Sequence, residues 1–517
     1  MKVLPSYFPI RKLTTTNKLI LLIVVSTLIR FFLGHNLQLG NDEVYYWTYA
    51  RYPDWSHFDH PPMVGFVIQL FTFDLLFDSE LGLRFGTIVL GSLNTVLIYL
   101  IGKEIYDERS GLIASVLFTI STYGLIISGL FVMPDAPLVF FWLLSLLFFI
   151  KYTKLIGFAR ANRYLFFSFT ALGLAIYSKY QAFYLLLGYF IYFIVYQRNI
   201  FKNPYLYLSL IAPVIFTTII IYWNYINQFS GINYHSNRIS LFSNSFNIDS
   251  FLREIFGQIA YINPFNYVLI IISLLAYKKR NYFKRPYMNL LLFVSIPLIL
   301  TTVFLSVFRD TLPHWSSVAY VTLLPLAAVY LSNKKNITYI YYVLFFILLL
   351  SVIGVKVVNN NWFGGDEEID FNSDRLGKND PTLDMFGWDQ IQSKLTELEI
   401  SDKKLSNLPL VSYKWYPAAH LDYYVAKPMH KDIYVLGDIN TIHKYYWINK
   451  RKKSLEYGQN AIYITHSRNF HPPEKTMNKY FQKSSLLSKF PIKRGEQIVE
   501  FGYIYLLEHY SFIEVKK

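Results

Sequence analysis

Long apolar runs recur along the first two thirds of the chain and limit what it can fold into. A helix needs about 20 apolar residues to cross a bilayer. Runs near this length lie at 19–34, 82–102, 111–130, 135–150, 164–178, 181–197, 205–226, 251–276, 287–307, 315–332 and 337–357. The pattern predicts a polytopic α-helical membrane protein with about 11 to 13 transmembrane helices, because only helices and closed barrels satisfy their backbone in lipid.

A shorter apolar run at 62–77 is interrupted by Asp74. We expect it to form a helix that lies in the membrane interface. If it crosses the bilayer instead, it adds to the number of spans.

Charged residues divide the chain into two parts. They make up 16% of the whole, against about 25% in ordinary soluble domains, and residues 361–517 hold 42 of the 83. We therefore predict a transmembrane catalytic domain at 1–357 with an outer loop at 35–81, a linker at 358–382 and a soluble domain at 383–517. Alternating strand-like and helix-like segments make an α/β fold the expectation for that last part.

The net charge of +15 follows the membrane topology. Basic residues gather in every second loop between the apolar runs, and the intervening loops are mainly acidic. The positive-inside rule then predicts a cytoplasmic N-terminus and an extracytoplasmic C-terminal domain. The basic excess is thus an orientation signal, and no nucleic-acid partner is expected. The chain has no Cys, which excludes a thiolate metal site and a Cys nucleophile.

The first outer loop is the most informative segment for chemistry. Residues 40–66 contain the acids and histidines Asp42, Glu43, Asp54, His57, Asp59 and His60. One carboxylate can accept a proton from an acceptor group while its neighbour orients the substrate. Desolvation near the bilayer raises the pKa of such groups toward a useful range. The competing interpretation is a helix N-cap, with the acids at the positive end of the helix dipole.

Two prolines follow Asp59 and His60 and fix the chain as it returns to the membrane. Such a segment holds the two polar side chains rigidly at the interface. The alternative is a helix that starts at the prolines, with solvated polar residues before it.

Further charged residues are predicted on the outer side. Asp135 lies in the sequence MPDAP and Lys179 in YSKYQ. Lys179 breaks the positive-inside pattern, so it needs a partner: an anionic phosphate, unless the side chain snorkels to the surface. The other outer cations are Arg84, Arg238, Arg309 and His314, the last followed by Trp315.

Five motifs occur in a fixed order: DE-x-YYW, DHPP, PDAP, SKY and HW. In this order the chain resembles the polytopic glycosyltransferases of the GT-C fold. It is most similar to bacterial relatives of the protein O-mannosyltransferases, a group that includes lipid A aminoarabinose transferases and lipopolysaccharide galacturonosyltransferases. The resemblance covers roughly residues 19–330 and continues weakly through GWDQ (387–390).

The resemblance implies the reaction and its partners. The donor is a polyprenyl (undecaprenyl) phosphate sugar, used on the outer face of the bacterial inner membrane with inversion at the anomeric carbon. The acceptor is lipid A, lipopolysaccharide or another envelope glycan, lipid or protein. Asp42 matches the catalytic aspartate of the first outer loop, and Glu43 matches its acidic neighbour, which helps to position the acceptor.

The resemblance also implies a substrate-binding set. Asp59 stands where aminoarabinose transferases carry a Glu in a Glu-Lys-Pro-Pro pattern, and here His60 replaces the Lys. Asp135 and Lys179 match positions near the chamber. Together with Tyr45 and the outer cations given by the topology, the predicted substrate-binding residues are Tyr45, Asp59, His60, Arg84, Asp135, Lys179, Arg238 and His314. No cofactor is certain. A divalent metal ion is possible, with Asp59 and His314 as candidate ligands.

Two other classes of protein remain open. A transporter or flippase of lipid-linked sugars would place ionisable residues near the bilayer midplane, often in paired repeats. An outer-face binding or assembly protein would work mainly through 358–517. In that case the acids of the first outer loop would be dispensable.

Overall fold

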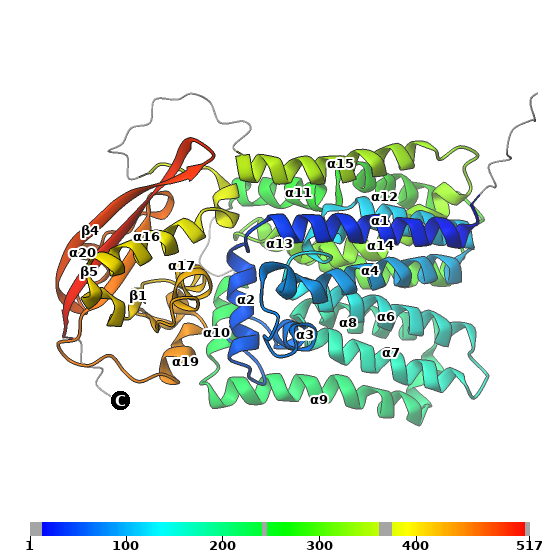
Figure 1. The fold of residues 1–517 in the computed structure, drawn as a ribbon. Helices are drawn as coiled ribbons and strands as arrows, with labels where there is room; N and C mark the ends of the chain where they lie inside the picture. The colour runs from blue at the N-terminus through cyan, green and yellow to red at the C-terminus, as the bar shows by residue number, and fades with distance from the viewer. Residues whose placement is uncertain (1–12, 240–245, 361–374, 512–517) are drawn as a thin grey trace, which may run out of the picture.

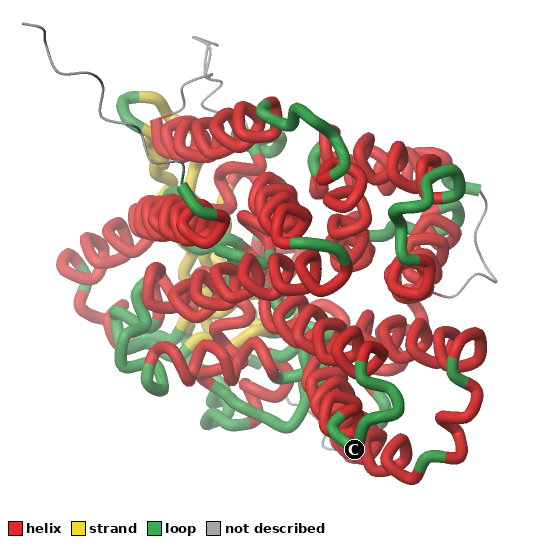
Figure 2. Tube along the Cα trace, turned by 90° about the vertical axis from the view of Figure 1, so that its right-hand side faces the viewer, coloured by secondary structure: helices red, strands yellow, loops and turns green. Residues whose placement is uncertain are grey.

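The structure is a computed structural model that describes residues 13–239, 246–360 and 375–511. It has two parts (Figure 1): a bundle of long helices and, at one end of it, a domain built around a β-sheet. Figure 2 views the bundle along its helices, with the sheet behind it.

The bundle contains most of the helices. They are α1 (Thr15–Asn36), α2 (Asn41–Arg51), α3 (Met63–Thr72), α4 (Glu80–Ile105), α5 (Glu108–Ile120), α6 (Asp135–Lys154), α7 (Ala161–Ile176), α8 (Phe183–Tyr196), α9 (Pro204–Ile226), α10 (Ser230–Ile239), α11 (Ile248–Ile262), α12 (Pro264–Tyr277), α13 (Arg285–Ser306), α14 (Ser317–Ser332) and α15 (Tyr339–Asn360). Short helices join several of them: η1 (Tyr123–Ile127), η2 (Tyr180–Ala182), η3 (Arg198–Lys202) and η4 (Pro313–Ser316).

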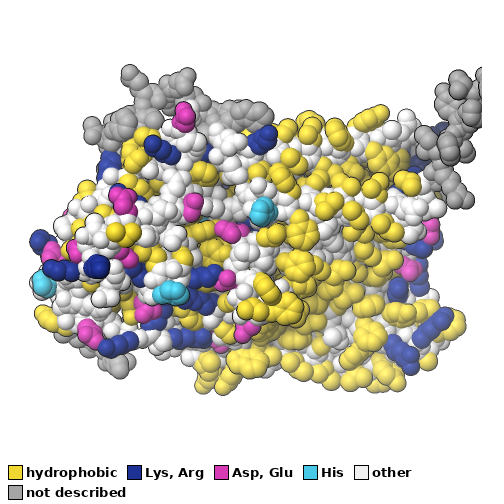
Figure 3. Space-filling model, viewed as in Figure 1, with side chains coloured by type: hydrophobic (Ala, Val, Ile, Leu, Met, Phe, Trp, Pro, Cys, Tyr) yellow, Lys and Arg dark blue, Asp and Glu magenta, His cyan; other side chains and the backbone are white. Residues whose placement is uncertain are grey.

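The predicted membrane character is confirmed. Within the described ranges, seven helices are long and apolar enough to cross a bilayer, or eight if the bent pair α11–α12 counts as one span. Each predicted run contains a helix, but the runs in α5, α7, α8 and α14 form α-helices of only 13 to 16 residues. The short helix η4 precedes α14 and extends the apolar segment to 20 residues. Hydrophobic side chains cover the flank of the bundle (Figure 3), and Lys and Arg lie at the end opposite the sheet domain.

The predicted single span at 251–276 is corrected to two helices. α11 and α12 meet at an angle of 97°. Asn263, at the break, has a left-handed φ of 67°, and its side chain accepts the N–H of Asn266 to cap α12. Pro264 follows and cannot continue the preceding helix. Hydropathy alone could not locate this corner, because both sides of it are apolar.

The segment at 62–77 forms a short helix, as predicted. α3 has ten residues, about half of the length that crosses a bilayer. It ends in a turn where Phe73, Asp74 and Leu75 all have positive φ. α3 packs closely on α2: a Cβ added at Gly65 would lie 2.8 Å from the Cβ of Tyr49.

The predicted C-terminal α/β domain is confirmed as a mixed five-stranded sheet. Its strands are β1 (Leu410–Ser412), β2 (Ile433–Val435), β3 (Ala461–His466), β4 (Phe481–Arg494) and β5 (Gln497–Tyr510), in the order β2-β1-β3-β5-β4. β1 pairs in parallel with β2 and β3, whereas β5 runs antiparallel to β3 and β4. The helices are α16 (Trp388–Ser401), α17 (Trp415–Leu421), α18 (Ile439–Ile442), α19 (Tyr445–Lys450) and α20 (Pro473–Thr476), with η5 (Pro381–Met385), η6 (Lys403–Asn407), η7 (Asp422–Ala426) and η8 (Ser467–Asn469).

The linker predicted at 358–382 is only partly described. α15 continues to Asn360, and η5 begins at Pro381. Residues 361–374 lie outside the described part of the chain.

α2 lies between the two parts (Figure 1). Its buried residues Val44 and Trp47 belong to one hydrophobic cluster with Trp388 and Ile391 of α16 and Leu410 of β1. The outer loop and the sheet domain therefore share a core. Burial of this apolar surface fixes the position of α2 against the sheet domain as much as against the bundle.

Candidate active site

The two acids at the start of α2 have different surroundings. Gly40 is the N-cap residue, and Glu43 accepts its backbone N–H through Oε2 at 3.0 Å. Of the two acids, Glu43 therefore has the capping role: it is the third residue of the helix, and its side chain bonds back to the N-cap residue. Asp42 forms no hydrogen bond or ion pair with any described residue, and its side chain is exposed.

Glu43 is held by a buried arginine. Arg84 of α4 donates from Nε and Nη2 to the two oxygens of Glu43, at 2.8 and 2.6 Å. Its remaining N–H groups donate to the backbone oxygens of Gly34, Leu37 and Gln38. All five donors of Arg84 are therefore used within the protein. In this structure Arg84 anchors the loop, and its predicted role in substrate binding stays a prediction.

The pKa of the Asp42 carboxyl group is raised and lies close to neutral pH. A water molecule can reach the side chain of Asp42, but the surrounding protein desolvates its carboxyl group and raises its pKa to about 6. The negative charge of Asp59 raises the pKa further. Lys179 acts in the opposite direction, while Asp135 and Asp384 raise the pKa further. Asp42 thus lies within electrostatic reach of groups from both parts of the molecule, and it is accessible and unpaired.

Asp59 is fixed by two tyrosines of α2. The hydroxyls of Tyr45, at 3.0 Å, and Tyr49 both donate to Oδ1 of Asp59. The backbone oxygen of Asp59 contacts Nε2 of His235 in α10 at 2.8 Å. Tyr45 is buried, so in this structure its hydroxyl positions Asp59. The other oxygen of Asp59 bonds to no described residue.

Lys179 has a protein partner. Its Nζ lies 2.6 Å from Oδ2 of Asp135, at the start of α6, and both side chains are almost fully buried. The hydroxyl of Tyr123 in η1 donates to Oδ1 of Asp135 at 2.8 Å. The partner that the sequence required for Lys179 is therefore Asp135, and two N–H groups of the ammonium group bond to no described residue.

The predicted outer cations gather around His60. Burial lowers the pKa of His60 well below its ordinary value, and the positive charges of Lys179, His235, His314 and Arg238 lower it further. His60 is therefore neutral at pH 7.

Aromatic rings pack against two of these side chains, Arg238 and His314. Arg238 lies over the rings of Tyr234 and Trp315, at 5.5 and 5.2 Å. His314 lies edge-on to Tyr261, with ring centroids 5.9 Å apart. His235 was not predicted from the sequence; its only signal is its position one turn before Arg238.

No metal centre is visible in the described ranges, because no group of three or more His, Asp or Glu side chains there is arranged to hold a metal ion. Asp59 and His314 as metal ligands stay a prediction from the sequence.

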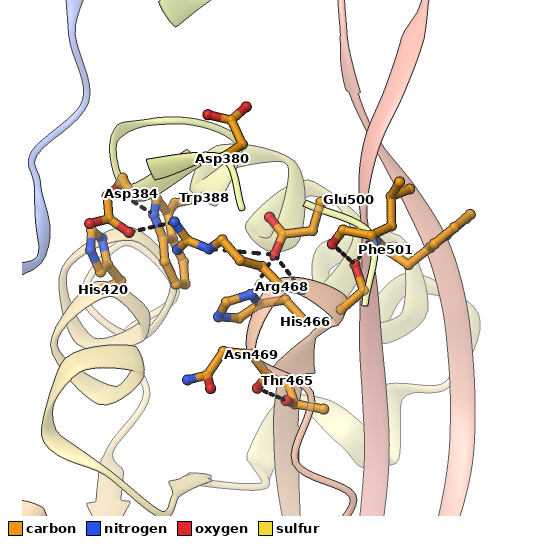
Figure 4. A network of polar contacts seen from close by, with 12 residues as sticks. Asp380, Asp384, Trp388, His420, Thr465, His466, Arg468, Asn469, Glu500 and Phe501 are labelled. Atoms are coloured by element: carbon orange, nitrogen blue, oxygen red, sulfur yellow. Dashed lines mark hydrogen bonds and ion pairs between the residues drawn. The ribbon is translucent and has the colours of Figure 1, made fainter. Parts of the chain in front are cut away.

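The sheet domain contains a polar network that includes Asp384, His420 and Arg468 (Figure 4), and two of its members contact Asn41, the residue next to Asp42. Asn41 contacts Nε2 of His420 through its Oδ1 at 2.8 Å and donates from Nδ2 to Asp384 at 2.7 Å. Arg468, which follows β3, forms an ion pair with Asp384. In the same network, His466 hydrogen-bonds Glu500 of β5.

The sheet domain also holds the other end of α2. The buried Nζ of Lys444 donates to the backbone oxygens of Thr48 and Tyr52, at 2.9 and 2.8 Å. Arg51 forms a 2.7 Å ion pair with Asp422. These contacts were not predicted, because nothing in a single sequence pairs positions that lie 371 to 396 residues apart.

The comparisons with known proteins agree with this architecture. Residues 59–223 match the model of a family described as dolichyl-phosphate-mannose-protein mannosyltransferase. No curated protein matches the chain in sequence. The solved structure of ArnT from Cupriavidus metallidurans bound to undecaprenyl phosphate has a TM-score of 0.59 and 14% identity, over 95% of this chain and 98% of that chain. Its apo state gives 0.59 and 12% over the same shares. An Archaeoglobus fulgidus oligosaccharyltransferase tethered to an acceptor peptide gives only 0.48 and 14%, over 83% of this chain and 65% of that chain.

These findings agree with the resemblance seen in the motifs. The family description names a mannosyltransferase, and the likeness to ArnT confirms the GT-C fold with a C-terminal sheet domain. The family model begins at residue 59, so it does not include Asp42.

Proposed function

We propose that the protein transfers a sugar from a polyprenyl phosphate donor, such as undecaprenyl phosphate sugar, to an envelope acceptor, with inversion and with Asp42 as general base. The observation that carries this proposal is the state of Asp42. Asp42 is accessible and has no hydrogen-bond or ion-pair partner in the described part of the chain, and its pKa of about 6 leaves it mostly ionised at pH 7. A base with such a pKa contributes about 10²–10⁴-fold to a rate.

In the proposed reaction each site residue has a separate role. The acceptor hydroxyl oxygen attacks the anomeric carbon and bonds to it, and the hydroxyl proton passes to Asp42. The bond between that carbon and the phosphate oxygen breaks at the same time, and the polyprenyl phosphate leaves. Lys179 and Arg238 stabilise the negative charge that grows on this phosphate, while the neutral His60 can donate a hydrogen bond to it.

The rest of the site holds these groups in place. Glu43 and Arg84 fix the start of α2, which carries Asp42. Tyr45 and Tyr49 fix Asp59. Preorganised groups of this kind lower the barrier because they need no rearrangement when charge develops.

The same proposal covers location and acceptor. The bundle would sit in the bacterial inner membrane with 1–357 as its catalytic domain, the N-terminus in the cytoplasm and the sheet domain outside. Lys and Arg at the far end of the bundle support this orientation. The acceptor would be lipid A, lipopolysaccharide or another envelope glycan, close to the contact between Asn41 and the sheet domain.

The test is mass spectrometry of envelope lipids and glycans from cells with and without the gene. Restoring the wild-type chain should restore one added sugar, and Asp42→Asn should not, although its membrane insertion is normal. Asp310→Asn is the matched control, because Asp310 is an exposed acid paired with Arg253. An unchanged envelope in the cells without the gene would contradict the proposal. Movement of a lipid-linked sugar across vesicles without any transfer would favour a flippase.

A further inference from the structure

A polar pocket lies away from Asp42, at the C-terminal end of α2. It forms where the loop at 53–58, the end of α9 and helix α19 meet. His57, Trp223, Lys444, Trp447 and Arg451 are among its lining residues. None of them takes part in the sugar transfer proposed above.

Two lining side chains carry buried nitrogen atoms without a partner. Nε1 of Trp223 and Nε2 of His57 make no hydrogen bond to any described residue. Trp223 is 2% exposed and His57 is 3% exposed. An indole N–H can only donate, and a buried donor without an acceptor costs about 1–3 kcal/mol. A ligand atom that accepts a hydrogen bond would therefore satisfy the indole N–H of Trp223.

Two basic side chains and one acid line the pocket, and burial lowers the pKa of the lysine, Lys444, well below its ordinary value. Lys444 uses two of its three N–H groups on backbone oxygens and forms no ion pair with a described carboxylate. The side chain of Arg451 is 44% exposed, and its Nη2 lies 3.7 Å from Oδ2 of Asp54, the one acid among the lining residues. Burial, followed by the charges of Lys444 and Arg451, lowers the pKa of His57 well below its ordinary value. His57 is therefore neutral at pH 7, and its ring can donate one hydrogen bond to an oxygen.

The pocket lies at the edge of the apolar surface. Trp223 belongs to the last turn of α9, a predicted span, and its ring lies 5.4 Å from that of Trp447 in the sheet domain. Nearby side chains of α9, Tyr222 and Tyr225, are exposed, and so is Trp55. Tyr and Trp in such places are typical of the interface between membrane and water, where lipid head groups lie.

We propose that this pocket binds an oxygen of a phosphate group, and that the phosphate belongs to the head group of an anionic membrane lipid. One phosphate oxygen accepts from the indole N–H of Trp223 and from His57. Lys444 and the more exposed Arg451 balance the charge. Free phosphate would present the same oxygens, so the experiment separates the two sources.

The experiment measures lipid binding to the purified full-length chain in detergent by native mass spectrometry. The probes are phosphatidylglycerol and a diacylglycerol with the same acyl chains, each with and without inorganic phosphate as competitor. We expect phosphatidylglycerol to bind about tenfold more tightly, as a charge-assisted hydrogen bond allows. Trp223→Phe and Arg451→Gln should each remove most of that preference.

Matched variants control for the loss of an aromatic ring or a charge. Trp55→Phe changes an exposed Trp of the same loop, and Lys450→Gln removes the cation that precedes Arg451; neither residue lines the pocket. Both should bind lipid as the wild type does. Displacement by inorganic phosphate would support the oxyanion site and assign it to soluble phosphate, and resistance to displacement would assign it to the lipid.

Equal binding of the two lipids, or an unchanged preference in Arg451→Gln, would overturn the proposal and leave the pocket to ordered water. Arg451 is partly exposed and its variant should fold, which a melting curve checks. None of these results depends on sugar transfer.

Discussion

Arg84 of α4 donates hydrogen bonds to both carboxylate oxygens of Glu43, and both side chains are almost completely buried. One helix of the bundle thereby fixes the start of α2, one residue after Asp42. The sheet domain reaches the residue on the other side, Asn41, through His420 and Asp384. Asp42 is thus free between two fixed neighbours.

Removing Arg84 should damage the fold more than any exposed ion pair would. Arg84→Met leaves the Glu43 carboxylate buried without a counter-ion, which costs about 3–5 kcal/mol. Lys103→Met is the control, because Lys103 forms an exposed pair with Glu108 and should contribute about 0–1 kcal/mol. Thermal unfolding in detergent measures both. Equal melting temperatures for the two variants would show that the Arg84–Glu43 pair does not hold the loop.

The activity should fall as the pH drops through about 6. Asp42 works as a base only when ionised, and its pKa is raised to about 6, so protonation removes activity below that pH. Asp59→Asn should move the midpoint to lower pH, because the charge of Asp59 is one of the causes of the raised pKa. The measurement is kcat/KM for transfer as a function of pH. A midpoint that does not move in Asp59→Asn would separate the observed titration from Asp42.

Lys444 should act on the site through α2. Lys444→Met leaves the backbone oxygen of Tyr52 without its Lys444 donor, at about 1–3 kcal/mol. The oxygen of Thr48 loses one of two donors, because it still accepts the N–H of Tyr52. The amides of α2 should then exchange with deuterium about tenfold faster. Lys450→Met, which removes an exposed lysine of the next helix, should leave this exchange unchanged. Unchanged exchange in Lys444→Met would mean that the sheet domain does not hold α2.

The sequence predicts those features that repeat along the chain. Apolar runs located the long helices, and the spacing of acids and prolines located the first outer loop. The corner at Asn263 was missed because hydropathy does not register a left-handed residue between two apolar helices.

Some site residues could be predicted from motifs in the sequence, whereas others depend on tertiary contacts. Asp42, Asp135 and Lys179 were named from motifs, and the structure brings them within electrostatic reach of one another. Arg84 was expected to bind substrate, since a sequence shows a charge but not the groups that neutralise it. The contacts of Lys444 and His420 depend on tertiary packing between distant segments, which no local pattern encodes.

Lys179 and Asp135 should have opposite effects on donor binding. Lys179→Met removes a cation proposed to face the phosphate and should weaken binding of undecaprenyl phosphate about tenfold, the loss expected for one charge-assisted hydrogen bond. Asp135→Asn keeps a side chain of the same size and frees the ammonium group from its carboxylate. It should therefore bind undecaprenyl phosphate as tightly as the wild type or more tightly.

Native mass spectrometry of the purified variants with undecaprenyl phosphate measures this difference. Lys154→Met is the control for loss of a lysine, because Lys154 pairs with Glu104 at the far end of α6. A matching melting temperature for Asp135→Asn would exclude misfolding as the cause of any change. Equal losses in Lys179→Met and Asp135→Asn would show that the pair supports the fold and that Lys179 does not bind the phosphate.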